Sequence, residues 1–585
     1  MASTRPRNGT SENGAARSAD ALLARVTRES AGRTAGILLC AAGASAASLA
    51  LPAVLGSTLD LLLEGHPDAG RALAAALALT AADVALDAAA ALLAGTVGAR
   101  STAWLRLRAI RRLLAAAPHH VSPFSPGDVA TRLSTNATEA GAAPAGAAQI
   151  VAAVIAPVGA LVALFVIDPW TGLTFVVGLP VLGLLLRSFA RHSSDSVSRY
   201  QRVQSLIATR LTDALGGARA IAAAGTADEE RARVLRPLEE LGTEGRRMWS
   251  VHGSAMARSG VLMPMLITAV LAVGGLGLAD GRISVGDLLA VSRYAALAAG
   301  LGSVAGPLAA LVRGRTAARR VNALFAVPPL AYGRAELPPD GPGTLELRGV
   351  GVDRDGVRVL RDVDLRVPGG ETAAIVGRSG AGKSTLAAVA GRLSDPDEGE
   401  VRLDGVPLAS VAADVLRTEV GYAFERPALQ GATVADAIAA GAETAPPERV
   451  RSAARAAGAE GFVQVLPRGY ATPLDEAPLS GGELQRLGLA RAFAHAGRLM
   501  ILDDATSSLD TATERQVDRA LAREVRPGTR VVIAHRLSTA ARADLVVWLD
   551  GGRIRAVRSH AELWRDPDYR AVFGHTDDSD GRGDR

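Results

Sequence analysis

The sequence is almost without lysine and cysteine. Lys383 is the only lysine among 64 Lys and Arg residues, and Cys40 is the only cysteine in 585 residues. A single cysteine excludes an intrachain disulfide and a cysteine-rich metal site. The excess of Ala, Gly and Arg is typical of a GC-rich genome and explains the scarcity of lysine without any function. The one lysine that remains therefore needs an explanation of its own.

A clustered basic face is also missing, although the net charge is +5 and the sequence pI is about 9.8. Nucleic-acid binding proteins gather their basic residues on one face. Here the arginines flank apolar runs, where they mark cytoplasmic loops. We therefore expect no nucleic-acid partner.

Apolar residues crowd into the first 325 or so positions. A helix needs about 20 apolar residues to cross the hydrocarbon core of a bilayer. Six stretches meet this length, at roughly 35–57, 71–97, 147–167, 171–188, 255–279 and 285–309. Arginine-rich segments such as "GARSTAWLRLRAIRR" follow the second, fourth and sixth, whereas the other loops are short. This asymmetry places the N-terminus and the long loops in the cytoplasm, and we expect a multi-pass protein of a bacterial plasma (inner) membrane.

Charged residues fall inside these predicted spans. Asp83 and Asp87 are four residues apart and share one helix face, while Arg258 and Arg293 lie in the fifth and sixth spans. Charged residues in a membrane usually face a cavity or each other. Two interpretations stay open: a polar substrate path, or a structural Asp–Arg pair between helices.

A phosphate-binding loop begins the soluble half. "TAAIV" reads as a strand and "KSTLAAVAGRL" as a helix, and the loop between them meets the pattern G-x-x-x-x-G-K-[ST] with Gly377, Gly382, Lys383 and Ser384. Glycines let backbone N–H groups converge on phosphate oxygens at a helix N-terminus. Lysine carries a compact ammonium on a thin alkyl chain, whereas the planar guanidinium of arginine is too bulky for the narrow opening of this loop. This explains the retained lysine.

Three further motifs follow in order. "LSGGELQRLGLARAF" begins at Leu479, and "RLMILDDATSSLD" contains a buried strand that ends at Asp503 and Asp504. A carboxylate at such a strand end can hold Mg²⁺. "TRVVIAHRLST" predicts another buried strand with His535 at its end, in the position of a γ-phosphate sensor.

This order of motifs resembles the ATP-binding-cassette (ABC) family, and with six fused spans the chain looks like a half-transporter of the exporter type. The resemblance covers about residues 20–572. It implies a multidomain membrane protein, with a six-helix all-α transmembrane domain followed by an α/β P-loop NTPase (ABC ATPase) domain. It also implies a dimer with two ATP molecules sandwiched head to tail. Residues 125–136 and 216–225 resemble the segments that dock on the ATPase domains in that family.

The expected domain boundaries follow from this comparison. We expect a disordered segment at 1–20, the transmembrane domain at 21–325, a linker at 326–342, the ATPase domain at 343–572 and a disordered tail at 573–585. Residues 1–34 are too few for a peptidase domain, so we do not expect cleavage of a leader by this chain.

The resemblance assigns the site residues. Asp504, His535 and Glu425 would be catalytic, and Ser384, Glu425 and Asp503 would hold Mg²⁺. ATP would be held by Gly377, Arg378, Ser379, Gly380, Ala381, Gly382, Lys383, Ser384 and Thr385, by Arg354, by Ser480, Gly481, Gly482 and Glu483, and by Asp510. Ser480, Gly481 and Gly482 would serve the nucleotide of the partner chain.

Four positions depart from the family pattern. Asp504 stands where the family has a catalytic Glu, and Glu425 stands at the Mg²⁺-contacting Gln. Glu483 replaces the Gln of the signature, and Arg354 stands where an aromatic residue stacks on adenine. An Asp is one methylene shorter than a Glu, and a 1 Å misplacement can cost about 10²-fold in rate. We expect a chain that binds ATP but hydrolyses it slowly at its own phosphate loop.

The predicted function is export of a small molecule or peptide, coupled to ATP binding and hydrolysis, by a heterodimer of this chain with a second half-transporter. Three alternatives stay open: a homodimeric exporter, a partner that only clamps ATP without hydrolysing it, and a siderophore-type importer built on the exporter fold. The sequence does not specify the substrate.

Overall fold

The computed structural model describes residues 9–300, 305–440, 446–495, 497–507, 509–523 and 528–574. The chain forms two compact units, one of Met1–Arg111 and Ser125–Ala326 and the other of Arg112–Phe124 and Val327–Arg585. Residues 112–124, which we placed in the transmembrane domain, thus cluster with the second unit. They are tied there by Arg112 Nε, which donates to the Val327 carbonyl (2.6 Å), and by the Leu330 amide, which donates to the Ala115 carbonyl (2.7 Å).

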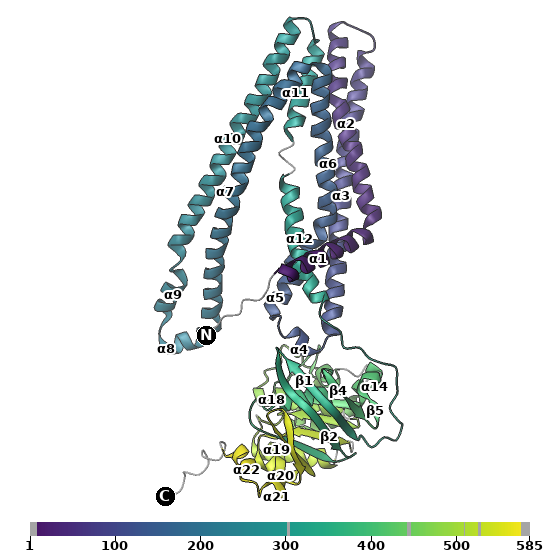
Figure 1. Cartoon of the computed structure of the whole chain (residues 1–585), viewed down its shortest axis with the longest axis vertical. Helices are drawn as coiled ribbons and strands as arrows, with labels where there is room; N and C mark the ends of the chain where they lie inside the picture. The colour runs from purple at the N-terminus through teal and green to yellow at the C-terminus, as the bar shows by residue number, and fades with distance from the viewer. Residues whose placement is uncertain are drawn as a thin grey trace. The chain divides into compact units, whose positions relative to one another are not determined.

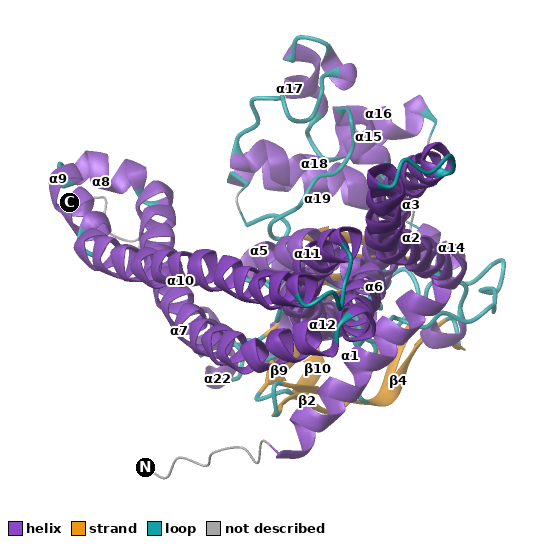
Figure 2. Cartoon of the chain, turned by 90° about the horizontal axis from the view of Figure 1, so that it is seen from above, coloured by secondary structure: helices purple, strands orange, loops and turns teal. Residues whose placement is uncertain are grey.

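The described part of the first unit is helical (Figure 1). Its long helices α7 and α10 pack along each other, as Figures 1 and 2 both show. The helices are α1 (Gly9–Glu29), α2 (Ala31–Leu63), α3 (Ala69–Leu114), α5 (Pro126–Thr131), a π-helical turn (Arg132–Asn136), α6 (Ala137–Ile167), α7 (Pro169–Gly216), α8 (Ala218–Ala224), α9 (Ala227–Leu235), α10 (Leu238–Ala279), α11 (Val285–Ala299) and α12 (Ala305–Phe325).

Four segments in the described residues are long and apolar enough to cross a membrane. They are Ala31–Leu63, Ala69–Leu114, Pro126–Ile167 and Val261–Ala279. The first three contain the first three predicted spans, and the fourth covers most of the fifth. The fourth predicted span lies within α7 and the sixth begins in α11, and the side chains of 181–188 and 301–305 lie outside the described part of the chain.

Two buried or half-buried acids, Asp60 and Asp168, hold the start of α7 and the loop between α10 and α11. Asp168 caps α7 by accepting from the Thr171 amide (3.2 Å), and it also pairs with Arg282 in the loop between α10 and α11. Asp60, near the end of α2, accepts from the Ser284 hydroxyl (2.6 Å) and the Gly286 amide (2.7 Å). Each acid therefore joins segments that are distant in the sequence.

The second unit contains two sheets. One has the order β2-β1-β4-β5 and the other β10-β9-β3-β8-β7-β6. In the larger sheet β9, β3, β8, β7 and β6 run parallel, while β10 is antiparallel to β9. The strands are β1 (Leu345–Arg354), β2 (Val357–Val367), β3 (Thr372–Val376), β4 (Glu398–Leu403), β5 (Val406–Pro407), β6 (Val420–Phe424), β7 (Leu499–Asp503), β8 (Thr529–Ile533), β9 (Leu545–Asp550) and β10 (Arg553–Arg558).

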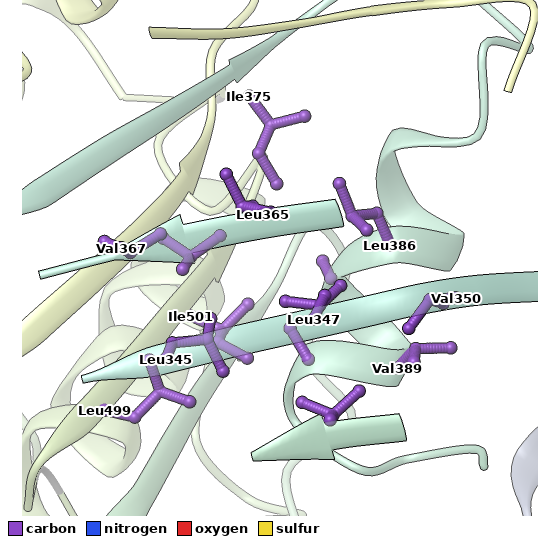
Figure 3. Packing of buried hydrophobic residues seen from close by; sticks show 14 of the residues in the cluster. Leu345, Leu347, Val350, Leu365, Val367, Ile375, Leu386, Val389, Leu499 and Ile501 are labelled. Atoms are coloured by element: carbon purple, nitrogen blue, oxygen red, sulfur yellow. The ribbon is translucent and has the colours of Figure 1, made fainter. Parts of the chain in front are cut away.

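Helices and apolar side chains cover these sheets. Figure 3 shows Leu386 and Val389 of α13 packed with Leu347 of β1 and Ile501 of β7, so that one buried cluster joins both sheets to the helix after β3. The helices of this unit are α4 (Pro118–Val121), α13 (Lys383–Ala390), α14 (Ala413–Glu419), α15 (Val434–Ala439), α16 (Pro447–Ala456), α17 (Glu460–Val465), α18 (Gly481–Ala494), α19 (Thr511–Arg523), α20 (Leu537–Arg542), α21 (His560–Leu563) and α22 (Pro567–Phe573), with 3₁₀ turns at Leu408–Ser410 and Gly469–Ala471.

Candidate nucleotide-binding site

Several of the predicted site residues lie at the ends of four neighbouring parallel strands. The phosphate loop follows β3, Asp503 ends β7 and Asp504 follows it, Glu425 follows β6, and His535 comes two residues after β8. The carboxyl ends of parallel strands lie at the same edge of a sheet, where open α/β sheets bind ligands. The topology thus brings four sequence-distant motifs to one edge.

The phosphate loop needs glycine at two positions. Gly380 has φ +79° and Gly382 has φ +101°, a region that other residues rarely adopt. A Cβ at Gly382 would also lie 2.9 Å from Leu360 Cδ2. The loop can therefore keep its curvature, with amides available at the start of α13, only with these glycines.

Lys383 lies across the inside of the loop. Its Nζ donates to the Gly377 carbonyl (2.8 Å) and the Arg378 carbonyl (3.0 Å), and the residue is only 6% exposed. Burial lowers the pKa of this ammonium, while Asp504 and Asp503 oppose the shift. A bound phosphate can take the place of the two carbonyls as hydrogen-bond acceptor, which agrees with the steric reason for lysine here.

Ser384 and Asp503 meet at the foot of the loop. The Ser384 hydroxyl donates to Asp503 Oδ1 (3.1 Å), and the Tyr422 hydroxyl donates to Asp503 Oδ2 (3.3 Å). Burial raises the pKa of Asp503, partly offset by these hydrogen bonds. Mg²⁺ prefers oxygen ligands and is usually held by one or two protein groups together with substrate phosphates. A hydroxyl beside a carboxylate at a phosphate loop fits this ion.

Asp504 has an unusual backbone conformation. Its φ of +50° lies in the left-handed region, which is uncommon for a residue with a side chain. Burial raises the pKa of its carboxyl, His535 opposes the shift, and Glu425 and Asp503 add to it. The Asp504 side chain thus belongs to the same electrostatic group as the other predicted catalytic residues.

Glu425 and His535 are more open to solvent. The side chain of Glu425 is 55% exposed, with its carboxylate 3.7 Å from the Arg426 guanidinium. His535 is exposed at the start of the turn that leads into α20. Both act on Asp504 through their charges, and their catalytic roles remain predictions.

The signature segment starts α18 with a reciprocal cap. The Ser480 hydroxyl (2.8 Å) and amide (2.8 Å) both donate to Glu483 Oε2, and the Glu483 amide contacts the Ser480 hydroxyl at 3.4 Å. These hydrogen bonds lower the pKa of Glu483. Ser480 and Gly481 are exposed, so the segment is presented at the surface of this unit. The substitution of Glu for Gln therefore places a fixed negative charge in the first turn of α18.

Arg354 and Asp510 also make local contacts. The Arg354 guanidinium donates to the Ser394 hydroxyl (3.3 Å) and lies 3.5 Å from the Asp397 carboxylate. Asp510 accepts from the Thr513 hydroxyl (2.6 Å) and amide (3.1 Å), which caps α19. Stacking of Arg354 on adenine and contact of Asp510 with nucleotide remain predictions.

Sequence reasoning missed Gln485. Its side chain is 2% exposed, and Nε2 lies within reach of the Glu425 carbonyl (3.3 Å), the Asp504 carbonyl (3.4 Å) and the Ser507 hydroxyl (3.3 Å). It therefore connects the signature helix to the segments that carry both atypical acids. The available signal was a lone amide on the otherwise apolar buried face of "LQRLGLARAF".

Sequence comparisons identify the family of the chain. The family model described as the ABC transporter transmembrane region matches residues 35–300, and the one described as ABC transporter matches residues 360–507. The chain is 59% identical over 538 residues to the ABC transporter ATP-binding protein RamA of Streptomyces coelicolor, which covers 92% of this chain and 84% of that protein. It is 32% identical over 466 residues to an ATP-dependent lipid A-core flippase of Hahella chejuensis, covering 78% and 80% of the two chains.

A solved structure supports the same fold. The structure of a bacterial Atm1-family ABC exporter with ATP bound superposes with a TM-score of 0.73 over 94% of this chain and 98% of that chain, at 24% identity. The chain therefore belongs to the ABC transporter family, as an exporter-type half-transporter that joins a multi-pass membrane domain to a cytoplasmic, ATP-binding ATPase domain.

Proposed function

We propose that this half-transporter works in a heterodimer with two unequal ATP sites, in which its own phosphate loop binds Mg²⁺-ATP but supports only slow hydrolysis. The observation that carries the proposal is Asp504, which stands directly after the strand-end Asp503 where the family has Glu. The cargo is a small molecule or peptide, and the membrane is the bacterial inner membrane.

The backbone at Asp504 gives little freedom to compensate for the shorter side chain. Its φ is +50°, and its carbonyl faces the buried Gln485 amide at 3.4 Å. An Asp carboxylate therefore stops short of the place that a Glu carboxylate would reach. A misplacement of about 1 Å can cost about 10²-fold in rate, because a general base must lie within hydrogen-bond distance of the proton that it accepts.

Glu425 makes the site less favourable for the reaction. Its carboxylate contributes to the raised pKa of both Asp503 and Asp504. The family Gln is neutral, whereas this Glu adds negative charge beside the place of the metal and the γ-phosphate. Mg²⁺, held by Ser384 and Asp503, would neutralise charge on the β- and γ-phosphates. The added carboxylate of Glu425 would repel the negatively charged phosphates.

The signature segment has the features needed to serve a partner. Ser480 and Gly481 are exposed at the N-terminus of the 14-residue helix α18, and the cap formed with Glu483 fixes the first turn. N–H groups at a helix N-terminus favour an anion. We therefore assign the faster hydrolysis to the partner's phosphate loop, completed by this segment.

ATP turnover of purified protein in nanodiscs tests the proposal. The full chain is measured alone and after co-expression with a candidate partner half-transporter. We expect negligible turnover alone and strong turnover in the complex. In the complex, Ser480→Ala should reduce turnover more than Asp504→Asn does. Strong turnover by the chain alone, abolished by Asp504→Asn, would contradict the proposal.

A further inference from the structure

The first unit contains a polar cavity between α2, α3 and α6. Its volume is about 330 Å³, within the usual range of small-ligand pockets. The three helices pack against one another beside it through Ile37, Val97 and Ala148, and Figure 2 shows them grouped when the chain is seen from above. The polar side chains that line it are Ser45, Ser48, Asp83, Asp87 and Gln149. Alanine methyl groups make up most of the remaining wall.

The two carboxylates in this cavity have no counter-charge among the described side chains. In the described part of the chain, neither Asp83 nor Asp87 forms an ion pair or a side-chain hydrogen bond, whereas Asp168 pairs with Arg282 and Asp60 accepts two hydrogen bonds. Asp83 lies near the middle of the predicted span 71–97, and a helix of that length crosses a hydrocarbon core of about 30 Å. Uncompensated acids at that depth are costly and mark functional sites.

A buried hydroxyl independently indicates a ligand. Ser45 is 8% exposed and lines the cavity, yet its hydroxyl has no hydrogen-bond partner within the described residues. Other hydroxyls in the same helices bond to their own backbone, as Thr58 does to the Val54 carbonyl (2.6 Å) and Thr80 to the Ala76 carbonyl (2.8 Å). The Ser45 hydroxyl is therefore free to bond to a molecule in the cavity.

The chemistry of the lining defines the class of ligand. Asp83 and Asp87 are neighbours on one helix face, since residues four apart lie about 5–6 Å from each other at Cβ. Carboxylate, hydroxyl and amide oxygens together can accept all the hydrogen bonds of an –NH₃⁺ group. A cavity of about 330 Å³ is much larger than the ≈ 30 Å³ share of one water, so a bare ion would leave most of it empty. An alanine wall suits an apolar body attached to the ammonium.

We propose that the cavity between α2, α3 and α6 binds an organic molecule through a protonated primary amine held by Asp83 and Asp87, with Ser45 and Gln149 as further acceptors. This site lies entirely in the first unit and does not depend on which ATP site hydrolyses. Its occupation is therefore measured by ligand binding and not by ATP turnover.

Dansylcadaverine, a fluorescent primary amine, is the probe, and its N-acetyl derivative is the matched neutral compound. Binding of each to the full chain in nanodiscs is followed by fluorescence at pH 7.5. Asp83→Asn and Asp87→Asn keep the side-chain shape but remove the charge. Asp68→Asn is the control, because Asp68 lies in the loop before α3, 3.0 Å from Arg71. Size-exclusion elution and Tm report whether each variant folds.

We expect Asp83→Asn and Asp87→Asn each to weaken dansylcadaverine binding by about tenfold or more, because each removes a charged acceptor. Asp68→Asn should bind it as the unchanged chain does, and the acetylated compound should bind the unchanged chain at least about tenfold more weakly. Ser45→Val should also weaken binding by removing an acceptor and narrowing the cavity. Equal affinity of the Asp83→Asn/Asp87→Asn double variant and the unchanged chain would overturn the proposal. Equal binding of the acetylated compound would overturn it too. A lowered Tm with unaltered affinity would show that the acids are structural, and the site would again be refuted.

Discussion

Lengthening the side chain at position 504 should speed hydrolysis at the chain's own phosphate loop. Asp504→Glu adds one methylene, which extends the carboxylate by about 1.3–1.5 Å. Asp504 is only partly buried, so the longer side chain has room. The backbone of Asp504 is in the left-handed region (φ +50°), and the Gln485 side chain contacts its carbonyl, so we expect the backbone to keep its position in the variant. The added reach is therefore directed into the site.

The size of the gain follows from the displacement that it corrects. A 1 Å error in position can cost about 10²-fold, and the charge of Glu425 remains in the variant. We expect single-site hydrolysis to rise by about 10- to 100-fold, which corresponds to a barrier lower by about 1.4–2.7 kcal/mol. The assay is phosphate release from saturating Mg²⁺-ATP by the chain alone in nanodiscs.

Asp503→Glu provides a matched control. It adds the same methylene to the neighbouring carboxylate, which already contacts the Ser384 hydroxyl at 3.1 Å and the Tyr422 hydroxyl at 3.3 Å. This change should lower nucleotide affinity and leave turnover unimproved. If Asp504→Glu hydrolyses ATP no faster than the unchanged chain, side-chain length does not limit the site and the reasoning is refuted.

Three further outcomes follow from the geometry. Gln485→Ala should lower the free energy of unfolding of the ATPase domain by about 1–3 kcal/mol, because it leaves buried polar groups without a partner. Gln516→Ala, on the exposed side of α19, should change this free energy little. Chemical denaturation followed by fluorescence measures both variants. Ser480→Ala should lower the free energy of unfolding by about 0.5–2 kcal/mol through loss of the helix cap, and it should reduce ATP turnover of the complex. Nucleotide binding at this chain's own phosphate loop should persist, as nucleotide titration would show. Mg²⁺-dependent ATP affinity should fall as the pH is lowered, because the metal binds the ionised form of Asp503. Since burial raises the pKa of Asp503, the fall should start at a higher pH than for an ordinary aspartate. Titrations of ATP affinity from pH 8 to 5 test this, and a flat profile would contradict it.

The sequence predicted correctly that several of its motifs follow the ends of buried strands. The phosphate loop, the strand-end aspartates and His535 all follow short apolar runs, and parallel strands necessarily gather such positions at one edge. The membrane half was predicted for the same kind of reason, since span length and arginine placement are local features.

What the sequence did not reveal depends on contacts between distant segments. The cap between Ser480 and Glu483 is visible in the spacing, but the reach of Gln485 to Glu425 and Asp504 requires the packing of α18 beneath two loops. Arg354 illustrates the same limit. Its position before the phosphate loop does not show that its guanidinium lies beside Ser394 and Asp397.

The grouping of residues 112–124 with the ATPase unit was likewise not predicted. The segment follows directly from α3, and its hydropathy does not mark a boundary. Contacts with distant residues place it there, among them the hydrogen bonds to residues 327 and 330 and a β-bridge between Ala116 and Pro329.

A single-turnover experiment tests the central claim most directly. The full chain alone is loaded in nanodiscs with γ-labelled ATP, hydrolysis is started with Mg²⁺, and bound ATP and released phosphate are followed together. The account predicts that ATP binds at Lys383 and Ser384 and stays largely uncleaved, with cleavage about 10- to 100-fold faster in Asp504→Glu. Rapid cleavage of all bound ATP by the unchanged chain, lost in Asp504→Asn, would show that Asp504 is already an effective base and would contradict the account.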